Sequence, residues 1–423
     1  MRSCLLGALI GALALVGTAC GGKQPTERPY KIESRYGVAD PEFARTMGNL
    51  LGPALVGGNA TTTLLNGDQI FPAMLDAIRS AQRTINFETF IYWSGQVGSD
   101  FTDALCERAG HGVKVHIIID SLGASRMDGK SIKKMTDAGI EWVKYHPLRF
   151  YELGWTEKFN NRTHRKLLVV DGKVGFTGGV GIADEWLGDA QSPRHWRDNH
   201  YLVRGPVVAQ LQSAFLDNWM QATGRVLHGE EYFPPLDEPG EQWAQVFRSG
   251  PNGGSESMQL MFLLSLAAAR QNIRLASAYF VPDRLTAEAL VDARRRGVRV
   301  QIVVPGPHID IEFVRRASRA RWGELLKAGV EIYEYQPTMY HCKQLIVDDL
   351  WVSIGSANVD NLSFRLNDEA NLNVLDARFA QEQARAFDDD VGRSRRITYR
   401  QWSKRPIGEK LYEGFATLFG WMM

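Results

Sequence analysis

Short apolar runs alternate with amphipathic segments through most of this chain. The run GVKVHIIID (112–120) follows the amphipathic stretch 101–111, and GVRVQIVVP (297–305) follows the amphipathic stretch 285–296. Runs of Val and Ile that are this short and lack polar alternation are typical of strands buried on both faces. The amphipathic stretches predict surface helices. The pattern therefore predicts an α/β fold with largely buried sheets.

The same pattern occurs twice, which indicates a duplicated module. AGIEWVKYHP (138–147) matches AGVEIYEYQP (328–337) and follows the first pair of elements at a similar place in each copy. We expect a first domain at 58–240 and a second at 241–423, because the stretch 233–254 is rich in Pro and Gly.

The two copies differ in one loop. The first copy has LRFYELGWTEKFNNRT between Pro147 and His164, whereas the second has only TMY between Pro337 and His341. An added loop at this place either shapes a substrate entrance or is a surface loop without a role. The sequence leaves both interpretations open.

The N-terminus differs from the rest of the chain. Arg2 precedes an apolar stretch at 5–16, which has the length of a signal-peptide core and is short for a membrane span. Small residues then lead to Cys20, as in a bacterial lipobox. Residues 1–20 thus predict a lipoprotein signal peptide with Cys20 lipidated, followed by a linker at 21–57. An uncleaved anchor or a plain secretory signal is the alternative, and each places the protein in the bacterial cell envelope, on the periplasmic side.

Composition narrows the function classes. The 423 residues are enough for two domains with sizeable cores. The net charge of +1 gives no general attraction to nucleic acid, so we expect no nucleic-acid partner. Outside the leader, Cys106 and Cys342 show neither metal-ligand spacing nor a disulfide pattern.

A histidine motif occurs once in each copy, with the spacing His-x-Lys-x4-Asp. Its residues are His164, Lys166 and Asp171 in the first copy and His341, Lys343 and Asp348 in the second. On a strand, a histidine and a lysine two positions apart share a face, whereas an aspartate seven positions from the histidine lies on the other face. Each His–Lys pair is therefore a candidate catalytic pair. The aspartates complete the candidate catalytic set, and we expect them to support the structure.

Further candidates follow each motif. Gly179 and Ser356 end the next apolar runs, where small residues let a phosphate approach the backbone, and Asn358 has an amide that can donate to a phosphate oxygen. Asp198 and Glu369 lie downstream of the first and second motif, and either carboxylate is suited to orient a histidine.

These residue types suit phosphodiester chemistry. Lysines neutralise the charge on the attacked phosphate, and a neutral imidazole can attack phosphorus to form a phosphohistidine. A second imidazolium can protonate the leaving oxygen. The scheme requires no metal and no cofactor, and the sequence shows no metal-ligand cluster. It does require the two motifs to face one phosphate.

On these residues the chain resembles the phospholipase D superfamily, and within it the bacterial cardiolipin synthases. The motifs that carry the resemblance are FETFIYWSG, NRTHRKLLVVDGKVGFTGG, YFVPD, GVEIYEYQPTM and GSANVDNLSFRLNDEANL. The resemblance implies two pseudo-twofold-related α/β/α sandwich domains with a shared active site. It also implies that His164 is the nucleophile and His341 the acid and base. The implied reaction moves the phosphatidyl group of one phosphatidylglycerol to another and releases glycerol.

Three features depart from that family. Gly181 stands where the first half usually has Asn, and Leu362 where related synthases often have Arg. The usual pair of N-terminal transmembrane helices is replaced by the lipoprotein-like leader. The first two departures bear on the choice of substrate more than on the class of reaction.

The C-terminus predicts contact with an anionic membrane surface. Apolar residues recur at helical spacing at Leu411, Phe415, Leu418 and Met422, with Phe419 beside them. The basic residues just upstream are Arg393, Arg395, Arg396, Arg400, Lys404 and Arg405. A C-terminal helix packed on the second domain has the same apolar stripe, so both interpretations remain.

The sequence leaves four functions to compare. The first is a phosphatidyltransferase that makes cardiolipin from phosphatidylglycerol, and the second is a phospholipase D that yields phosphatidic acid by hydrolysis. A nuclease and a non-catalytic lipid-binding lipoprotein are less consistent with the neutral charge and the two complete motifs. The pattern gives no indication of the oligomeric state.

Overall fold

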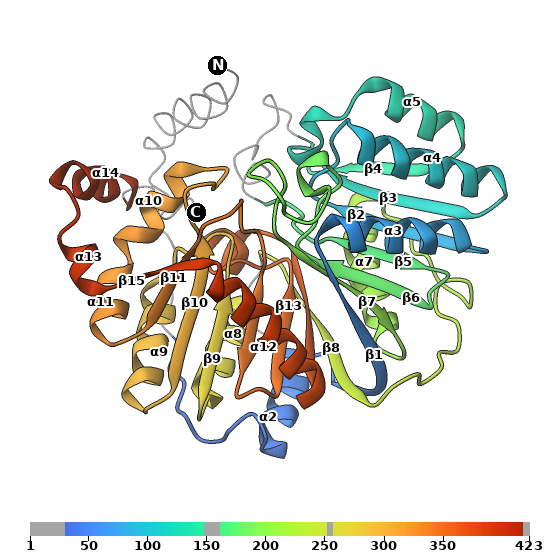
Figure 1. The fold of residues 1–423 in the computed structure, drawn as a ribbon. Coiled ribbons are helices and arrows are strands. Elements are labelled where there is room, and N and C mark those ends of the chain that lie inside the picture. The colour runs from blue at the N-terminus through green and yellow to red at the C-terminus, as the bar shows by residue number, and fades with distance from the viewer. Residues whose placement is uncertain (1–29, 148–160, 252–256, 418–423) are drawn as a thin grey trace. The chain divides into compact units, whose positions relative to one another are not determined.

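The fold is known from a computed structural model, which describes residues 30–147, 161–251 and 257–417 (Figure 1). The described residues from position 32 onward form one compact unit. The strands of this unit join in one 15-stranded sheet, in the order β15-β11-β10-β9-β12-β13-β14-β8-β1-β7-β6-β5-β2-β3-β4.

The elements of the first half alternate between strands and helices. They are β1 (Val56–Leu65), α3 (Asn66–Ser80), β2 (Thr84–Thr89), α4 (Gln96–Gly110), β3 (Lys114–Asp120), η3 (Gly123–Arg126), α5 (Gly129–Asp137), β4 (Glu141–Tyr145), β5 (Leu167–Val170), β6 (Val174–Gly178), η4 (Asp184–Trp186), β7 (Asn199–Arg204) and α7 (Val208–Thr223).

The second half follows the same plan and adds three elements at its end. Its elements are β8 (Gln242–Ser249), α8 (Met258–Ala268), β9 (Asn272–Ala276), α9 (Arg284–Arg295), β10 (Arg299–Pro305), α10 (Glu312–Ala320), α11 (Trp322–Lys327), β11 (Glu331–Tyr335), β12 (Gln344–Val347), β13 (Trp351–Gly355), η6 (Leu362–Leu366), β14 (Glu369–Leu375), α12 (Ala377–Gly392), β15 (Ser394–Ile397), α13 (Tyr399–Ser403) and α14 (Ile407–Thr417).

The strand order repeats about the centre of the sheet. Outward from the centre the first half reads β1-β7-β6-β5-β2-β3-β4, and the second half reads β8-β14-β13-β12-β9-β10-β11, with β15 added at the edge. In each half the inner pairs are antiparallel and the outer strands β2-β3-β4 and β9-β10-β11 are parallel. The predicted duplicated α/β architecture is confirmed.

The apolar runs lie where the sequence predicts buried strands. The runs at 112–120 and 297–305 contain β3 and β10, and the amphipathic stretches before them lie in α4 and α9. The strands are buried on both faces because helices cover both sides. Leu167 and Val169 pack with α7, whereas Leu168 and Val170 pack with α3 and α4, as the period of two requires.

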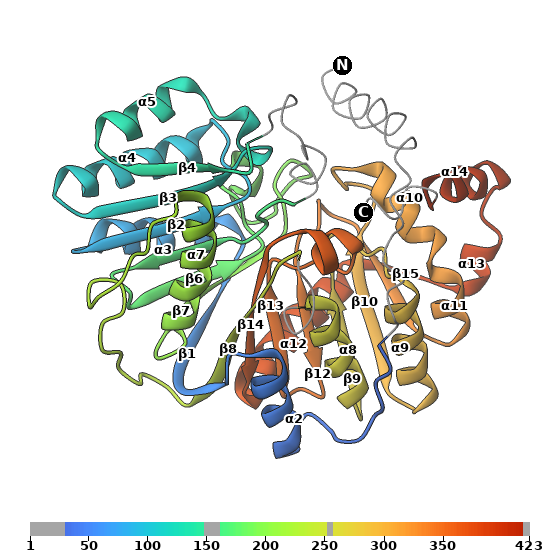
Figure 2. The ribbon, with the colours of Figure 1, turned by 180° about the vertical axis from the view of Figure 1, so that it is seen from behind.

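Layers are also visible in the second half. Figures 1 and 2 show α12 and α8 on opposite faces of its strands.

The helices of the second half begin at side-chain caps. The Asp283 carboxylate accepts the Thr286 N–H at α9, and the Asp376 carboxylate accepts the Phe379 N–H at α12. These caps fix where each helix begins after its strand.

The two sandwiches do not have separate sheets. Strand β1 of the first half pairs antiparallel with β8 of the second, through Val56 opposite Ala244 and Asn59 opposite Gln242. The register shifts between these pairs, so the join is irregular. The stretch 233–254, expected from its Pro and Gly content to separate the domains, therefore contains a strand that connects them.

The predicted linker at 21–57 is wrong for its C-terminal part. Helices α2 (Pro41–Thr46) and η2 (Met47–Leu51) lie there, and β1 begins at Val56. Phe43 is buried against Trp351, with ring centroids 4.9 Å apart and nearly perpendicular planes. Aromatic side chains of this size contribute strongly to a core when they are buried. This segment therefore belongs to the core of the second half, although it precedes the first half in the chain.

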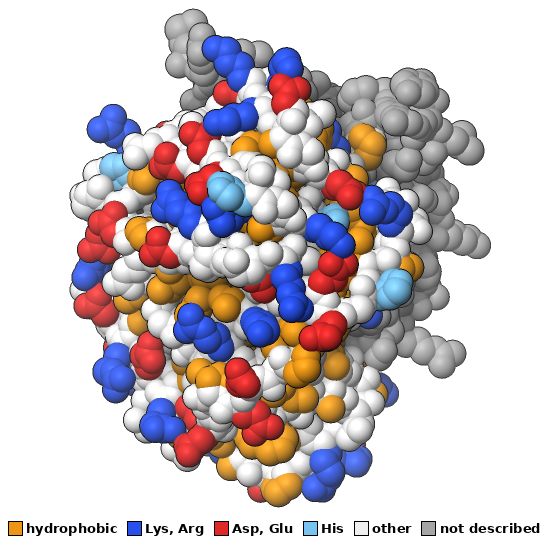
Figure 3. Space-filling model, turned by 90° about the vertical axis from the view of Figure 1, so that its right-hand side faces the viewer, with side chains coloured by type: hydrophobic (Ala, Val, Ile, Leu, Met, Phe, Trp, Pro, Cys, Tyr) orange, Lys and Arg blue, Asp and Glu red, His pale blue; other side chains and the backbone are white. Residues whose placement is uncertain are grey.

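The surface carries charged side chains of both signs. Figure 3 shows Lys and Arg side chains interspersed with Asp and Glu over one face of the molecule. Among the described residues, no helix combines the length and apolar character that crossing a bilayer would need. Cys20 and the rest of the predicted leader lie outside the described residues, as do most of the inserted loop and the side chains of the predicted apolar tail stripe.

Candidate active site

A backbone seam between the two halves sets the position of both histidines. Thr163 forms a parallel bridge with Asp368, and Tyr340 forms the equivalent bridge with Arg197. The N–H of His164 donates to the Asp368 carbonyl at 2.9 Å, and the N–H of His341 donates to the Arg197 carbonyl at 2.8 Å. Each histidine is therefore fixed by the half of the molecule that carries the other histidine.

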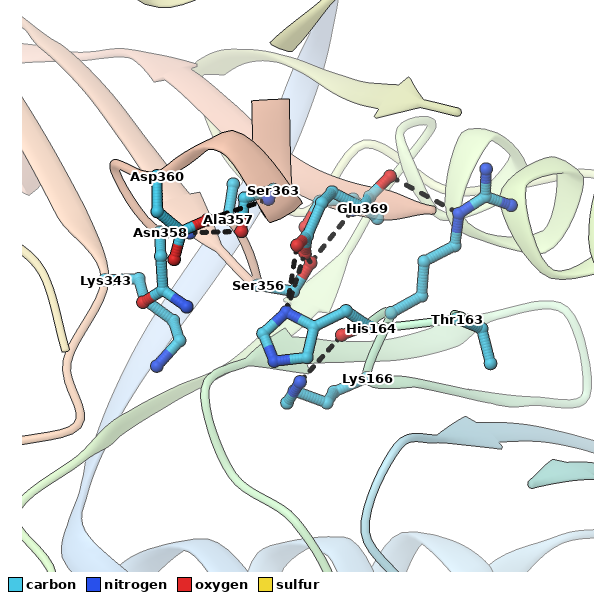
Figure 4. A network of polar contacts seen from close by, with 12 residues as sticks. Thr163, His164, Lys166, Lys343, Ser356, Ala357, Asn358, Asp360, Ser363 and Glu369 are labelled. Atoms are coloured by element: carbon cyan, nitrogen blue, oxygen red, sulfur yellow. Dashed lines mark hydrogen bonds and ion pairs between the residues drawn. The ribbon is translucent and has the colours of Figure 1, made fainter. Parts of the chain in front are cut away.

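The carboxylate for His164 comes across this seam. Nδ1 of His164 lies 3.0 Å from both carboxylate oxygens of Glu369. The hydroxyl of Ser356 donates to the same carboxylate at 2.5 Å, which holds it in place (Figure 4). A histidine whose Nδ1–H is held by a carboxylate presents Nε2 with a free lone pair.

The second histidine has an equivalent partner from the first half. Nδ1 of His341 lies 2.7 Å from Oδ2 of Asp198. The indole N–H of Trp186 donates to that same oxygen at 3.0 Å, and the Trp186 ring lies 5.4 Å from the His341 ring. Both predicted orienting acids therefore bond a histidine, and each bonds the histidine of the opposite half.

The lysines lie beside the histidines on both sides of the seam. Lys166 donates to the His164 carbonyl at 2.7 Å, and Lys343 donates to the His341 carbonyl at 2.6 Å. Lys343 is also 3.2 Å from each ring nitrogen of His341. Figure 4 shows Lys343 and Asn358 on one side of a common space, with His164 and Lys166 on the other.

Burial and positive charge lower the pKa of both histidines. The pKa of His164 is lowered by burial and by Lys166 and Lys343, although Glu369 opposes the shift. The pKa of His341 is lowered to about 3 by burial and by Lys343 and Lys166, although Asp198 opposes the shift. Because each lysine acts on the histidine of the other half, the four side chains form one electrostatic site.

The pKa values of the two lysines are lowered for the same reasons. Burial lowers the pKa of Lys166 to about 7, with Lys343 adding to the effect and Glu369 opposing it. Burial also lowers the pKa of Lys343. Two ammonium groups in one buried place therefore favour binding of an anion, because an anion would relieve their mutual repulsion.

The motif aspartates lie away from this chemistry, and their inclusion among the candidate catalytic residues is corrected. Asp171 follows the far end of β5 from His164, and its carboxylate accepts the N–H groups of Gln82, Arg83 and Thr84 at 2.7–2.9 Å.

The second copy repeats this arrangement. Asp348 accepts the N–H groups of Arg270, Gln271 and Asn272 at 2.7–2.9 Å. As the strand arithmetic predicts, both aspartates support the fold by holding the start of the adjacent strand.

Two of the three predicted phosphate-binding residues instead contact the carboxylates that orient the histidines. Ser356 is occupied by Glu369, and Gly179 leaves room for Asp198, because a Cβ there would lie 2.3 Å from Oδ1 of Asp198. Asn358 accepts the Tyr279 N–H at 3.3 Å through its oxygen, while its amide nitrogen points toward the common space (Figure 4). Asn358 remains the candidate phosphate ligand of this group.

Sequence reasoning missed the aromatic residues of the site. Besides Trp186, the Trp196 ring lies 5.3 Å from His341, and the Phe90 ring lies 5.4 Å from His164. Tyr279 is close to His341 and donates its hydroxyl to Asp310 at 2.7 Å. No spacing rule identifies such residues, although the WSG and YFVPD segments after β2 and β9 indicated the strand ends that supply two of them.

The two departures lie in different surroundings. A Cβ at Gly181 would lie 2.8 Å from Cβ of Ile91 and 3.3 Å from the Trp186 ring, so these side chains fill the space of an Asn. Leu362 begins η6 and is half-buried. Cys342, which follows His341 in the chain, is buried with its thiol 3.8 Å from the Arg197 carbonyl.

Comparison with known proteins identifies the relatives of the chain. A family model described as "Cardiolipin synthase, PLD-like domain" matches residues 74–219 and 263–391. The chain is 36% identical over 355 residues to cardiolipin synthase 2 of Bacillus anthracis, covering 84% of this chain and 68% of that protein. It is 35% identical over 360 residues to a cardiolipin synthase of Geobacillus thermodenitrificans, covering 85% of this chain and 71% of the relative.

A solved structure shares the fold at low sequence identity. The phosphatidylserine synthase of Haemophilus influenzae Rd KW20 has a TM-score of 0.68 at 14% identity, covering 90% of this chain and 100% of that chain. At this identity the match supports the fold alone.

Proposed function

The chain belongs to the cardiolipin synthase family of phospholipase D-like proteins, and on that premise we propose that it transfers a phosphatidyl group between two phosphatidylglycerol molecules. The products are cardiolipin and glycerol. One observation carries the proposal: each of the two buried His–Lys pairs receives its carboxylate from the opposite half, so both pairs belong to one site.

In the first step His164 acts as the nucleophile. Its Nδ1–H is held by Glu369, so the lone pair of Nε2 attacks the phosphorus of the donor lipid. The new bond joins Nε2 to phosphorus, and the bond from phosphorus to the headgroup glycerol oxygen breaks. His341 gives its proton to that oxygen, and glycerol leaves.

In the second step the reaction runs in the opposite sense. A headgroup hydroxyl of the acceptor lipid attacks the phosphohistidine and gives its proton to His341. The bond from phosphorus to Nε2 breaks, so His164 returns to its neutral form. Lys166 and Lys343 stabilise the charge on the phosphate oxygens in both steps, because charge builds up there in the transition state.

Substrate binding supplies the protonated form of His341 that the first step needs. In the free protein burial and Lys343 keep the pKa of His341 at about 3, so the ring is neutral near pH 7. A bound phosphodiester brings a negative charge between the lysines, which favours the imidazolium and raises this pKa. The acid is therefore formed where and when a phosphate is present.

Hydrolysis is the second candidate. Water can replace the acceptor hydroxyl in the second step, which would give phosphatidic acid as the main product. Both reactions form the same phosphohistidine. They differ in whether water or the hydroxyl of a second lipid attacks it.

Membrane attachment through Cys20 is part of the proposal. The motif at 17–20 supports a lipid anchor on the periplasmic side, close to the lipid substrate. Cys20→Ser is expected to release the protein from the membrane fraction of cells. Full retention of the variant in that fraction would argue against lipidation.

The test of the reaction uses phosphatidylglycerol with an isotopically labelled headgroup. Transfer releases one labelled glycerol for each cardiolipin formed and leaves one labelled glycerol in the product, as mass spectrometry can show. Phosphatidic acid in equal amount to the released glycerol would instead indicate hydrolysis. His164→Ala should abolish both reactions. Lack of turnover of any lipid by the unmodified chain would exclude the proposal.

A further inference from the structure

A hollow lined by arginines lies in the second half, outside the candidate active site. It has a volume of about 370 Å³ and is formed by α10, β15, α13 and the start of α14. We call it the arginine pocket. Its charged lining residues are Arg315, Arg316, Arg319, Arg395, Arg405 and Glu409.

The pocket contains more arginines than there are carboxylates to pair with them. Three guanidinium groups share the single buried carboxylate of Glu334: Arg315 at 3.0 Å, Arg319 at 2.8 Å and Arg395 at 2.6 Å. One negative charge cannot neutralise three positive charges, so this end of the pocket keeps an excess of positive charge.

The remaining carboxylates leave the sign of that charge unchanged. Glu413 bonds Arg405 at 2.6 Å and Arg319 at 3.3 Å, and Glu409 is no closer than 3.8 Å to an arginine. Glu312 pairs with arginines of its own helix. Five arginines thus face four carboxylates, which leaves a net charge that suits one monoanion.

Exposed apolar side chains, which we call the apolar rim, lie on or just before the helices that form the pocket. Ile407 is 75% exposed and Tyr412 is 48% exposed on α14, Tyr399 is 38% exposed at the start of α13, and Ile311 is 37% exposed just before α10. Apolar side chains beside a basic cluster are typical of surfaces that enter the interface of an anionic membrane. A pocket for a free phosphate ion would need no such rim.

We propose that the arginine pocket binds the phosphate group of an anionic phospholipid in a membrane surface, as a second lipid site that takes no part in the chemistry. The guanidinium groups supply paired N–H donors to the phosphate oxygens, and the apolar rim enters the headgroup region. This site orients the protein on the membrane and does not depend on the proposed reaction.

The position of the pocket suits such an orientation. Asp310, which accepts the Tyr279 hydroxyl beside His341, lies just before α10, and the pocket arginines follow on that helix. A helix rises about 1.5 Å per residue. Arg316 and Arg319 therefore lie on the order of 10 Å from Asp310 along the axis of α10. The arginine pocket and the Tyr279–Asp310 contact beside His341 are therefore neighbours along one element of the fold.

The test compares two neighbouring arginines of strand β15. Arg395 lines the pocket, whereas Arg396 lies on the other face of the strand, and their side chains are 58% and 59% exposed. The full chain with His164→Ala, which consumes no lipid, is mixed with phosphatidylcholine vesicles that contain or lack phosphatidylglycerol. Sedimentation gives the part of binding that depends on the anionic lipid.

Arg395→Gln should weaken that part about tenfold more than Arg396→Gln, because it removes a charge-assisted hydrogen bond as well as a charge. Equal effects of the two variants would reduce the pocket to general surface charge and overturn the proposal. Calorimetry with glycerol phosphate tests whether the pocket binds a soluble phosphate compound and not a membrane lipid. Saturable binding of this soluble ion that Arg395→Gln abolishes, with vesicle binding unchanged, would overturn the choice of a lipid.

A second pair of variants covers a failure of Arg395→Gln to fold. Arg316 pairs with Glu312 within α10, and Arg284 pairs with Glu288 within α9, both four residues apart. Only Arg316 lines the pocket. Arg316→Gln should therefore weaken anionic-lipid binding severalfold more than Arg284→Gln, and an equal effect would also overturn the proposal.

Discussion

Glu369 holds His164, although 205 residues separate them in the chain and Glu369 belongs to the half that carries the other histidine. Asp198 holds His341 in the same crossed manner. Neither half therefore contains a complete catalytic unit. A duplicated domain of this kind must pair with its copy before either histidine is oriented.

The crossed carboxylates predict a loss of catalysis when their charge is removed. Glu369→Gln should lower kcat about 10²–10⁴-fold, because an amide no longer fixes the Nδ1–H tautomer of His164. The measurement is the rate of cardiolipin formation by folded protein. Asp376→Asn is the matched control, because the new amide can still cap α12 and the site is untouched. A Glu369→Gln enzyme with unchanged kcat would contradict the assigned pairing.

For the motif aspartates we expect a loss of stability and little change in catalysis. Asp171→Ala leaves the N–H groups of Gln82, Arg83 and Thr84 without their acceptor, and should lower the free energy of unfolding by about 1–3 kcal/mol. Denaturant unfolding measures this change, and kcat per folded molecule should stay within severalfold. A loss of kcat of more than about a hundredfold, with stability unchanged, would return Asp171 to the catalytic set.

The indole N–H of Trp186 predicts a partial loss of catalysis. Trp186→Phe keeps an aromatic ring beside His341 but removes the donor to Asp198, so kcat should fall about tenfold or more, the value of a hydrogen bond to a charged group. Trp196→Phe is the control. Its ring also packs on His341, and among the described residues no hydrogen bond joins its indole to Asp198. Equal effects of the two variants would assign the role to packing.

The buried His341 predicts a pH dependence of stability. Its pKa of about 3 in the folded protein lies below the ordinary histidine pKa of 6.5. Between these values the unfolded chain binds a proton that the folded chain does not, so the free energy of unfolding falls as the pH falls from 6.5 toward 3. His341→Gln should remove this contribution and reduce the slope by up to about 1.4 kcal/mol per pH unit.

Urea unfolding at several pH values between 4.5 and 6.5 measures the slope, within the range where the protein stays folded. His111→Gln, a change at an exposed histidine on α4's C-terminal end, serves as the control. An identical slope for His341→Gln and the unmodified chain would show that His341 is not buried in its neutral form.

The local and repeated features of this protein can be predicted from its amino-acid pattern alone. Short apolar runs predicted β3 and β10, and the spacing within each motif placed the aspartate away from its histidine. These follow from the period of two along a strand, which depends only on the backbone. Duplication then made two motifs in one chain a stronger signal than one.

Which groups meet depends on how distant segments of the chain pack together. The crossed pairing of Glu369 with His164, the strand pair β1–β8, and the packing of Phe43 on Trp351 all join segments far apart in the chain. Local pattern fixes which face of a strand a side chain occupies, but a partner on another element is set by how the sheets and helices pack together. For this reason the sequence could single out both acids as candidates but could not say which histidine each would bond.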